Sequence, residues 1–373
     1  MARRRERGVT LIELMLTVAI GSIVGATFFA AMLAQQGAYI RRLDNLEAQQ
    51  NARAVLSLLK SHVRMAAFGY NPNKEMRGAI PIGACYSDGN PVVHSLVCDN
   101  VDENRAVAGV QGSGELEQTL ATRAGSDRMR VSYALADGLV EAPTNTHPLP
   151  LNVALDGVPP GHPIAGLALM SGACNAAPPD FAADLITVRG VPSNYSFVRL
   201  DSFVSSGCSS YADGFVFAPA EVVDFYIDRS VPRNPRLMMK RDPSADMDDT
   251  SAVHVAAYDI DDLQIQYGVD ANADGAFDPV GTVDPDGWCN DPRIPADGGD
   301  CATDLSSAEN YFMITSVRLA VVPRTRNYSP DREYGEGGDR TMQVFNHTLV
   351  GQGDGFTRWV FRATVALRNR DLR

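Results

Sequence analysis

Cysteine, histidine and tryptophan are scarce in this chain of 373 residues, which holds six, six and two of them. No cysteines form a C-x-x-C pair and the histidines are scattered, so the sequence does not favour a zinc site. The G-x-S-x-G, P-loop and H-E-x-x-H motifs of hydrolases, nucleotide-binding proteins and zinc peptidases are also missing. The sequence therefore predicts no catalytic site, and we expect that the chain is not an enzyme.

Basic residues are in the minority, with 33 lysines and arginines against 45 aspartates and glutamates. The formal net charge is −12, and the first eight residues alone carry +3, which leaves −15 on the remainder. So acidic a body is repelled by phosphate backbones, and we expect no nonspecific nucleic-acid binding. A local basic patch around Arg318, Arg324 and Arg326 is the one feature that would change this expectation.

Charge and proline are nearly absent from the stretch that follows the basic leader. The 26 residues from Val9 to Ala34 contain one charge, Glu13, and no proline. As a helix they would extend about 39 Å, which is enough to span a hydrocarbon core of about 30 Å. The arginines precede this stretch, so the positive-inside rule leaves the leader in the cytoplasm and sends the rest outward.

Two other interpretations of this stretch are a secretory signal peptide and a simple membrane anchor. A secretory signal peptide has an apolar region of about 7–15 residues, and the run here is longer and starts directly after the basic residues. A simple membrane anchor has no use for a carboxylate inside the run, where an ionisable group costs about 2.5–3.5 kcal/mol and usually has a function.

The segment Gly8-Val9-Thr10-Leu11-Ile12-Glu13-Leu14 resembles the class III signal of type IV prepilins and type II secretion pseudopilins. The resemblance implies that a prepilin peptidase cuts between Gly8 and Val9 and N-methylates the new terminus. Val9 stands where the family usually has phenylalanine. The same resemblance implies that Glu13 pairs with the amino terminus of a neighbouring subunit and sets the axial register during assembly, because a carboxylate in an apolar environment needs a cationic partner.

The helix is predicted to continue from Gln35 to about Gly69, because no proline interrupts it. Its apolar positions recur at helical spacing and should cover the body: Tyr39, Leu43, Leu46, Val55, Leu58 or Leu59, Val63 and Ala66. Charged side chains are expected on the outer face: Arg41, Arg42, Asp44, Glu47, Arg53 and Lys60.

After residue 70 the pattern changes to the period of two that marks half-buried antiparallel strands. It occurs in five places: 129–135, 223–227, 263–267, 317–321 and 359–367. Long loops are predicted at 136–163 and 268–305. Asp259, Asp261 and Asp262 beside one strand are interpreted as a solvated face.

The expected fold is therefore α+β and type IV pilin-like, with a long N-terminal helix packed on an antiparallel β-sheet head. Four parts are expected: a cytoplasmic leader at 1–8, a transmembrane half-helix at 9–34, an amphipathic half-helix at 35–69, and a periplasmic or extracellular head at 70–373.

Three further segments resemble the PilW family of type IV pilus minor pilins: MAAFGY at 65–70, DDLQIQYGVD at 261–270 and FRATVALRNR at 361–370. The resemblance implies a minor pilin that promotes the initiation of pilus assembly in a tip or priming complex. Its expected partners are other minor pilins, the major pilin, the prepilin peptidase, the inner membrane and a tip adhesin. A type II secretion pseudopilin, a tip adhesin and a DNA-capturing minor pilin remain alternatives, and the expected localisation is the inner membrane and then the pilus.

An even number of cysteines in an exported chain indicates disulfides. Six cysteines allow 15 pairings, and sequential pairing gives the shortest loops. We favour Cys85–Cys98, Cys174–Cys208 and Cys289–Cys301, with free buried cysteines as the alternative.

Residues 270–278 contain the first part of an EF-hand-like calcium loop, D-x-N-x-D-G-x-x-D. Oxygen ligands would come from Asp270, Asn272, Asp274, the carbonyl of Ala276, and Asp278. Position twelve is glycine instead of a bidentate glutamate, and a strand precedes the loop where an EF-hand has a helix. A structural calcium site is the hypothesis, and a plain acidic turn is the alternative.

Overall fold

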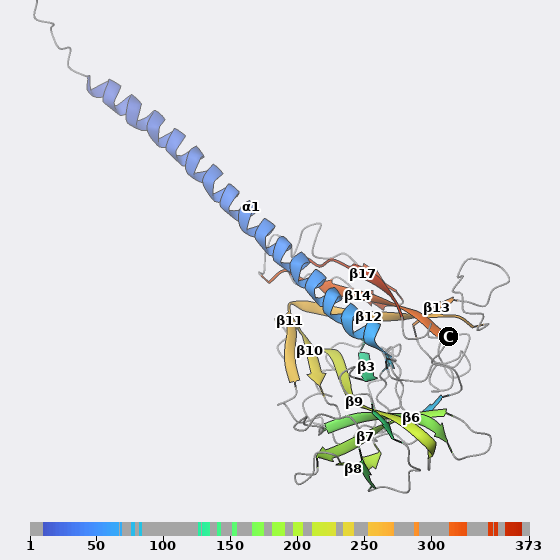
Figure 1. Cartoon of the computed structure of the whole chain (residues 1–373). Helices are drawn as coiled ribbons and strands as arrows, with labels where there is room; N and C mark the ends of the chain where they lie inside the picture. Colours follow the sequence, from blue (N-terminus) through green and yellow to red (C-terminus); the bar gives the residue numbers. More distant parts are fainter. Residues whose placement is uncertain are drawn as a thin grey trace, which may run out of the picture.

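The computed structural model describes nineteen parts of the chain: residues 10–66, 68, 76–78, 82–83, 126–127, 129–134, 140–142, 151–154, 166–174, 181–190, 197–203, 211–228, 234–241, 253–271, 287–290, 313–326, 342–345, 347–349 and 355–367. They form one long helix that projects from a β-rich head (Figure 1). The predicted α+β, pilin-like fold class is confirmed.

The helix α1 spans Leu11–Met65 without a break and is about 83 Å long at about 1.5 Å per residue. Thr10 is its N-cap and Ala66, with φ −49° and ψ 141°, is its C-cap. The predicted single helix is thus found, ending a few residues before the expected stop at Gly69. His62 and Arg64 lie in the last turn, where a positive charge suits the helix dipole.

The buried face of α1 differs from the predicted apolar stripe at the first three residues of that stripe. Tyr39, Leu43 and Leu46 are 64%, 46% and 52% exposed. The rest of the predicted stripe is confirmed, because Val55, Leu59, Val63 and Ala66 are buried. Toward the N-terminus the buried face continues at spacings of three and four through Ala52, Ala48 and Asp44 instead. The prediction that Asp44 lies on the outer face is wrong, and the small side chains of Ala48 and Ala52 explain why the helix can approach the head closely on this side.

Among the described residues, the larger sheet has eleven strands, and its main order is β11-β10-β9-β6-β7-β8-β5. β3 and β4 also pair with β9, β2 pairs with β3, and β1 pairs with β7 in parallel, while the other pairings are antiparallel. The bounds are β1 Met76–Gly78, β2 Ile82–Gly83, β3 Met129–Ala134, β4 Val140–Ala142, β5 Leu151–Ala154, β6 Gly166–Cys174, β7 Phe181–Gly190, β8 Phe197–Phe203, β9 Tyr211–Asp228, β10 Arg236–Arg241 and β11 Val253–Tyr258.

The smaller sheet has the order β13-β12-β14-β17 and lies against the second half of α1 (Figure 1). Its strands are β12 Ile260–Val269, β13 Gly287–Cys289, β14 Ile314–Pro323 and β17 Phe361–Ala366; β15 Met342–Val344 and β16 His347–Leu349 form a separate hairpin. β4 and β5 lie within the loop predicted at 136–163, and β13 within the one predicted at 268–305, so strands interrupt both predicted loops.

One core joins the helix to both sheets. Val55, Leu59 and Val63 of α1 pack with the inward-facing residues of the strands, among them Val223, Phe225, Leu263, Ile265, Val317, Leu319 and Val365. All five predicted strands are present, and the apolar residues that the alternation assigned to the core of β9, β12 and β14 are buried. Burial of such side chains contributes about 1.5–3 kcal/mol each, so the second half of α1 is an integral part of the head.

Candidate functional site: the helix tip and the helix–head junction

The tip of α1 carries a capping box formed by Thr10 and Glu13. The amide of Glu13 donates to Thr10 Oγ1 at 3.3 Å, and the amide of Thr10 donates to Glu13 Oε2 at 3.5 Å. Both residues are exposed. A carboxylate in the first turn also suits the positive end of the helix dipole. Glu13, predicted as an assembly residue, therefore has a local role in starting the helix and an exposed charge.

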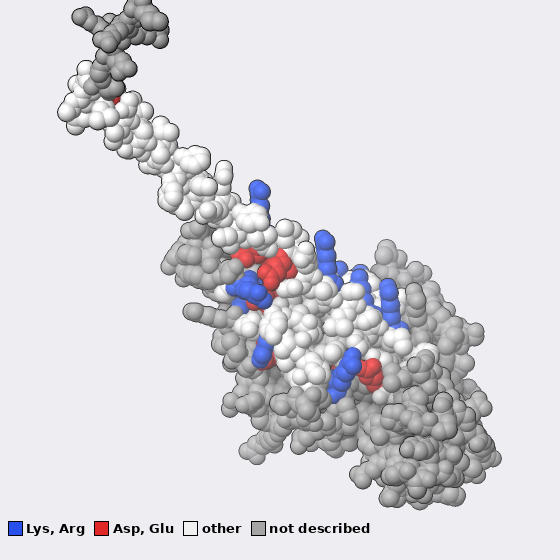
Figure 2. All heavy atoms as spheres, turned by 60° about the vertical axis from the view of Figure 1, so that its left-hand side comes forward, with Lys and Arg blue, Asp and Glu red and all other residues white. Residues whose placement is uncertain are grey.

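The first half of α1 is an uncovered apolar rod. Figure 2 shows this part of the helix almost free of charged side chains, and its large apolar residues are 49–76% exposed from Leu11 to Leu33. It is long and apolar enough to cross a membrane, and none of its most apolar window is buried against the head. The structure thus provides one candidate membrane span among the described residues, where the sequence predicted it.

Where α1 meets the head, acidic and basic side chains gather (Figure 2). Arg326 forms ion pairs with Glu47 of α1 at 3.3 Å and with Asp259 at 3.2 Å. The backbone of Asp259 adopts a φ of 60° between β11 and β12, and its carbonyl accepts from the amide of Arg324. Burial raises the pKa of Asp259 above its ordinary value, although Arg326 opposes the shift. This cluster ties the helix to the corner where the larger sheet passes into the smaller one.

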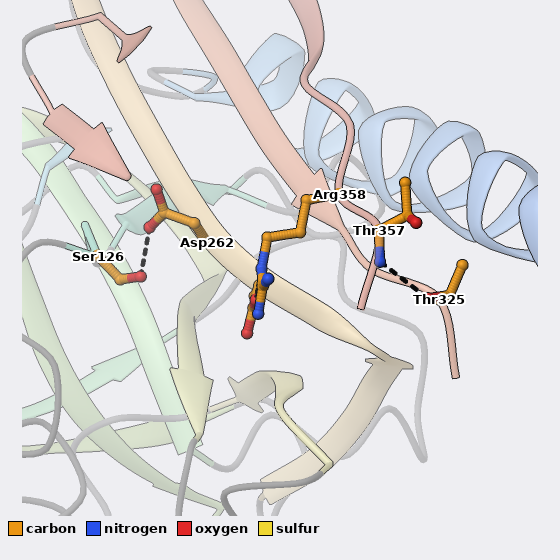
Figure 3. A network of polar contacts seen from close by, with 6 residues as sticks. Ser126, Asp262, Thr325, Thr357 and Arg358 are labelled. Atoms are coloured by element: carbon orange, nitrogen blue, oxygen red, sulfur yellow. Dashed lines mark hydrogen bonds and ion pairs between the residues drawn. The ribbon is translucent and has the colours of Figure 1, made fainter. Parts of the chain in front are cut away.

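The neighbouring aspartates of β12 lie inside the head. Asp261 pairs with Arg358, and both side chains are at most 10% exposed. Asp262 accepts a hydrogen bond from Ser126, and Thr357 donates its amide to Thr325 Oγ1 at 3.1 Å (Figure 3). The prediction that Asp259, Asp261 and Asp262 form a solvated face is wrong, because each has a distant polar partner that periodicity in a single strand cannot reveal.

A second polar chain lies at the far end of α1. His62 Nδ1 is 3.0 Å from the hydroxyl of Tyr133, which donates to Glu221 at 2.9 Å, and Arg241 pairs with Glu221 at 3.1 Å. Because Tyr133 donates onward to Glu221, Nδ1 of His62 is the donor to Tyr133. Burial lowers the pKa of His62 and raises that of Tyr133, so both groups are held neutral at neutral pH. No pattern in the sequence indicates these polar contacts, because the four residues come from four different elements.

Arg318, Arg324 and Arg326, the three arginines that could have formed a basic patch for nucleic acid, do not form a joint exposed patch. Arg324 is 3% exposed and lies over the ring of Phe356, and Arg326 is paired with two carboxylates. Arg318 lies over the ring of Trp288 and has no carboxylate partner in the part of the chain that the structure describes.

Several predicted site residues lie outside the described residues. They are Gly8 and Val9 of the processing site, Asn272, Asp274, Ala276 and Asp278 of the calcium loop, and Cys85, Cys98, Cys208 and Cys301. Asp270 is described: it is fully buried at the end of β12, and its amide donates to the carbonyl of Met313 at 2.8 Å. Cys289 is disulfide-bonded. Of Cys174 only the backbone, in β6, is described, so the pairing stays a prediction.

Comparison with protein families gives two matches. Residues 224–369 match the family described as type IV pilus-assembly protein W, PilW, and residues 3–29 match the prokaryotic N-terminal methylation motif. No curated protein and no solved structure matched the chain. The two matches support a PilW-type minor pilin, which confirms the predicted resemblance, and they associate the chain with other pilus components. With α1, the methylation motif is consistent with anchoring in a membrane.

Proposed function

Starting from a PilW-type chain, we propose that the protein is a minor pilin that promotes the initiation of type IV pilus assembly as part of a tip or priming complex. A prepilin peptidase removes residues 1–8, and α1 then holds the protein in the inner membrane with its head in the periplasm. On assembly the apolar half of α1 enters the core of the filament, and the head reaches the cell surface.

The observation that carries this proposal is the uncovered apolar half of α1 with a carboxylate at its tip. A rod of exposed apolar side chains is stable only in lipid or against other helices. Glu13 supplies a charge that needs a cation once water is excluded, and the new amino terminus of a neighbouring subunit is suited to this pairing. The size of the head favours the end of a filament, because a repeated lattice position would have to accommodate its bulk at every subunit.

Deletion of the gene, with complementation from a plasmid, tests the proposal. We expect that the deletion strain loses most surface pili and twitching, and that the wild-type gene restores both. Unchanged piliation would contradict the proposal. The N-terminal motif also resembles that of type II secretion pseudopilins, so exoprotein secretion is measured in the same strains. A defect in secretion with normal pili would favour the pseudopilin alternative.

We also propose that residues 270–278 form a structural calcium site. The support is that Asp270, the first ligand position, is buried at the end of β12 and tied to residue 313 by its backbone. A residue whose backbone is anchored in this way begins the loop from a fixed point, and calcium accepts carboxylate oxygen ligands. Thermal unfolding of the full chain in neutral detergent should occur at a higher temperature with calcium than with chelator. The variant Asp274→Asn should lose that difference, and an equal response in the variant would exclude the site.

A further inference from the structure

The outer face of the smaller sheet, which points away from α1, carries two neighbouring arginines, Arg318 and Arg362. Along β14 the residues Val317, Leu319 and Val321 face the core, so Arg318 faces the opposite side. Arg318 pairs with Thr364 of β17, which makes Arg362 its diagonal neighbour at about 7–8 Å between strands. Both arginines therefore project from the same face of the smaller sheet, and the charge of Arg362 is close enough to lower the pKa of Arg318.

Neither arginine has a carboxylate partner among the described residues. The guanidinium of Arg318 lies 3.6 Å from the centre of the Trp288 ring. That of Arg362 lies 5.8 Å from the ring of Phe345 and donates to the carbonyl of Gln343 at 3.0 Å. Such contacts hold a guanidinium in place while leaving its charge without a counterion. In a chain of net charge −12, two neighbouring cations without an acid are notable because acidic side chains outnumber basic ones.

The positive charges of Arg318 and Arg362 repel each other. Burial and, after it, the charge of Arg362 lower the pKa of Arg318. Two forks of N–H donors thus project from one face of the smaller sheet, and an oxyanion near them would relieve the repulsion between the two charges.

We propose that Arg318 and Arg362 form a binding site for a carboxylate of an acidic segment on a partner protein. Guanidinium forks match carboxylates in a bidentate manner. A short acidic segment suits these two arginines better than a long polyanion such as nucleic acid, because the acidic body repels a ligand more strongly the more negative charge it carries. The inference deepens the proposed function, on which it rests for the identity of the partner, by naming the chemistry of one partner surface.

A peptide titration tests this site separately from piliation, so the failure of either proposal is distinguishable. A hexaglutamate peptide is added to the full chain in neutral detergent at low salt, and fluorescence of Trp288 is followed in a Trp359→Phe background. We expect saturable binding that the double variant Arg318→Gln/Arg362→Gln weakens roughly tenfold or more, because two charge-assisted contacts are lost. Arg53→Gln, at an exposed arginine of α1, is the matched control and should leave the affinity unchanged.

The single variant Arg362→Gln keeps the test valid if Arg318→Gln lowers stability, because Arg362 is exposed. Thermal melts of every variant establish that each is folded. An absence of binding, or a loss that is equal in Arg53→Gln, would overturn the proposal. Tighter binding of inorganic phosphate or of a thymidine oligonucleotide at the same two arginines would also overturn it, in favour of a phosphate site.

Discussion

Glu13 combines two roles that a single substitution can separate. Its carboxylate closes the capping box with Thr10, and its charge lies exposed at the tip of the helix. Glutamine can fill the same position of a capping box but carries no charge, whereas leucine provides neither.

We predict that Glu13→Gln and Glu13→Leu both fail to restore pili in the deletion strain, although Glu13→Gln keeps the cap. The reason is that, in the proposed function, the charge and not the cap pairs with a neighbouring subunit. Electron microscopy of surface pili is the measurement, with immunoblots of membranes to establish equal amounts of protein. Full restoration by Glu13→Gln would show that the cap alone is required.

His62 makes the junction of helix and head sensitive to acid. Its ring faces Tyr133 and Phe225, with Glu221 and Arg241 behind them, and burial is the main cause that lowers its pKa below the ordinary 6.5. As the pH falls through 6.5 the unfolded chain binds a proton that the folded protein still excludes. Stability therefore decreases from about pH 6.5 down to the lower pKa of the folded state.

Thermal unfolding between about pH 7.5 and about pH 5.5 measures this effect across the ordinary range of histidine. We predict a smaller loss of melting temperature on acidification in His62→Gln than in the wild type. His254→Gln, at an exposed position of β11, is the control and should keep the wild-type slope. Identical slopes in the wild type and His62→Gln would exclude His62 as the cause.

At the scale of elements, α1 was the easiest part to predict and its contact face the hardest. The absence of proline and the apolar run define one helix, and the structure has it. The stripe of large apolar residues pointed to Tyr39, Leu43 and Leu46, but the head is contacted through Ala48 and Ala52. A large apolar side chain is expected to be buried, but the sequence alone does not say whether it is buried against the head or against another molecule.

The strands, too, could be predicted only in part. Alternation located β9, β12 and β14, since their inward residues are apolar. It did not reveal that Asp224 and Asp262 on the other faces are also fully buried, because their surroundings come from segments far away in the chain. The N-terminal motif was predictable because its residues are contiguous, whereas the contact of His62 with Tyr133, 71 residues away, depends on the completed fold.

Ala52 tests the close approach of α1 to the head. It is fully buried, whereas Ala54 of the same helix is exposed. We predict that Ala52→Leu lowers the free energy of unfolding by about 1–3 kcal/mol through overpacking. Ala54→Leu should change it by less than about 0.5 kcal/mol. Circular dichroism melts of the full chain in neutral detergent provide the measurement, and equal stability of the two variants would contradict the observed helix face.

The whole molecule combines two parts with opposite demands on their surroundings. The second half of α1 shares one core with both sheets, while its first half has no cover within the chain. Such a protein is stable in a membrane and can leave it only for another apolar environment. The family matches at 3–29 and 224–369 fall on these two parts, the helix start and the sheet that holds its end.

Mass spectrometry of surface filaments sheared from cells tests the central claim most directly. The account predicts that the filaments contain this chain in its processed form, beginning at an N-methylated Val9, in a far smaller amount than the main subunit. Membranes of the same cells should contain the processed chain as well. Detection of the processed chain in membranes but never in filaments would contradict its role as a minor pilin.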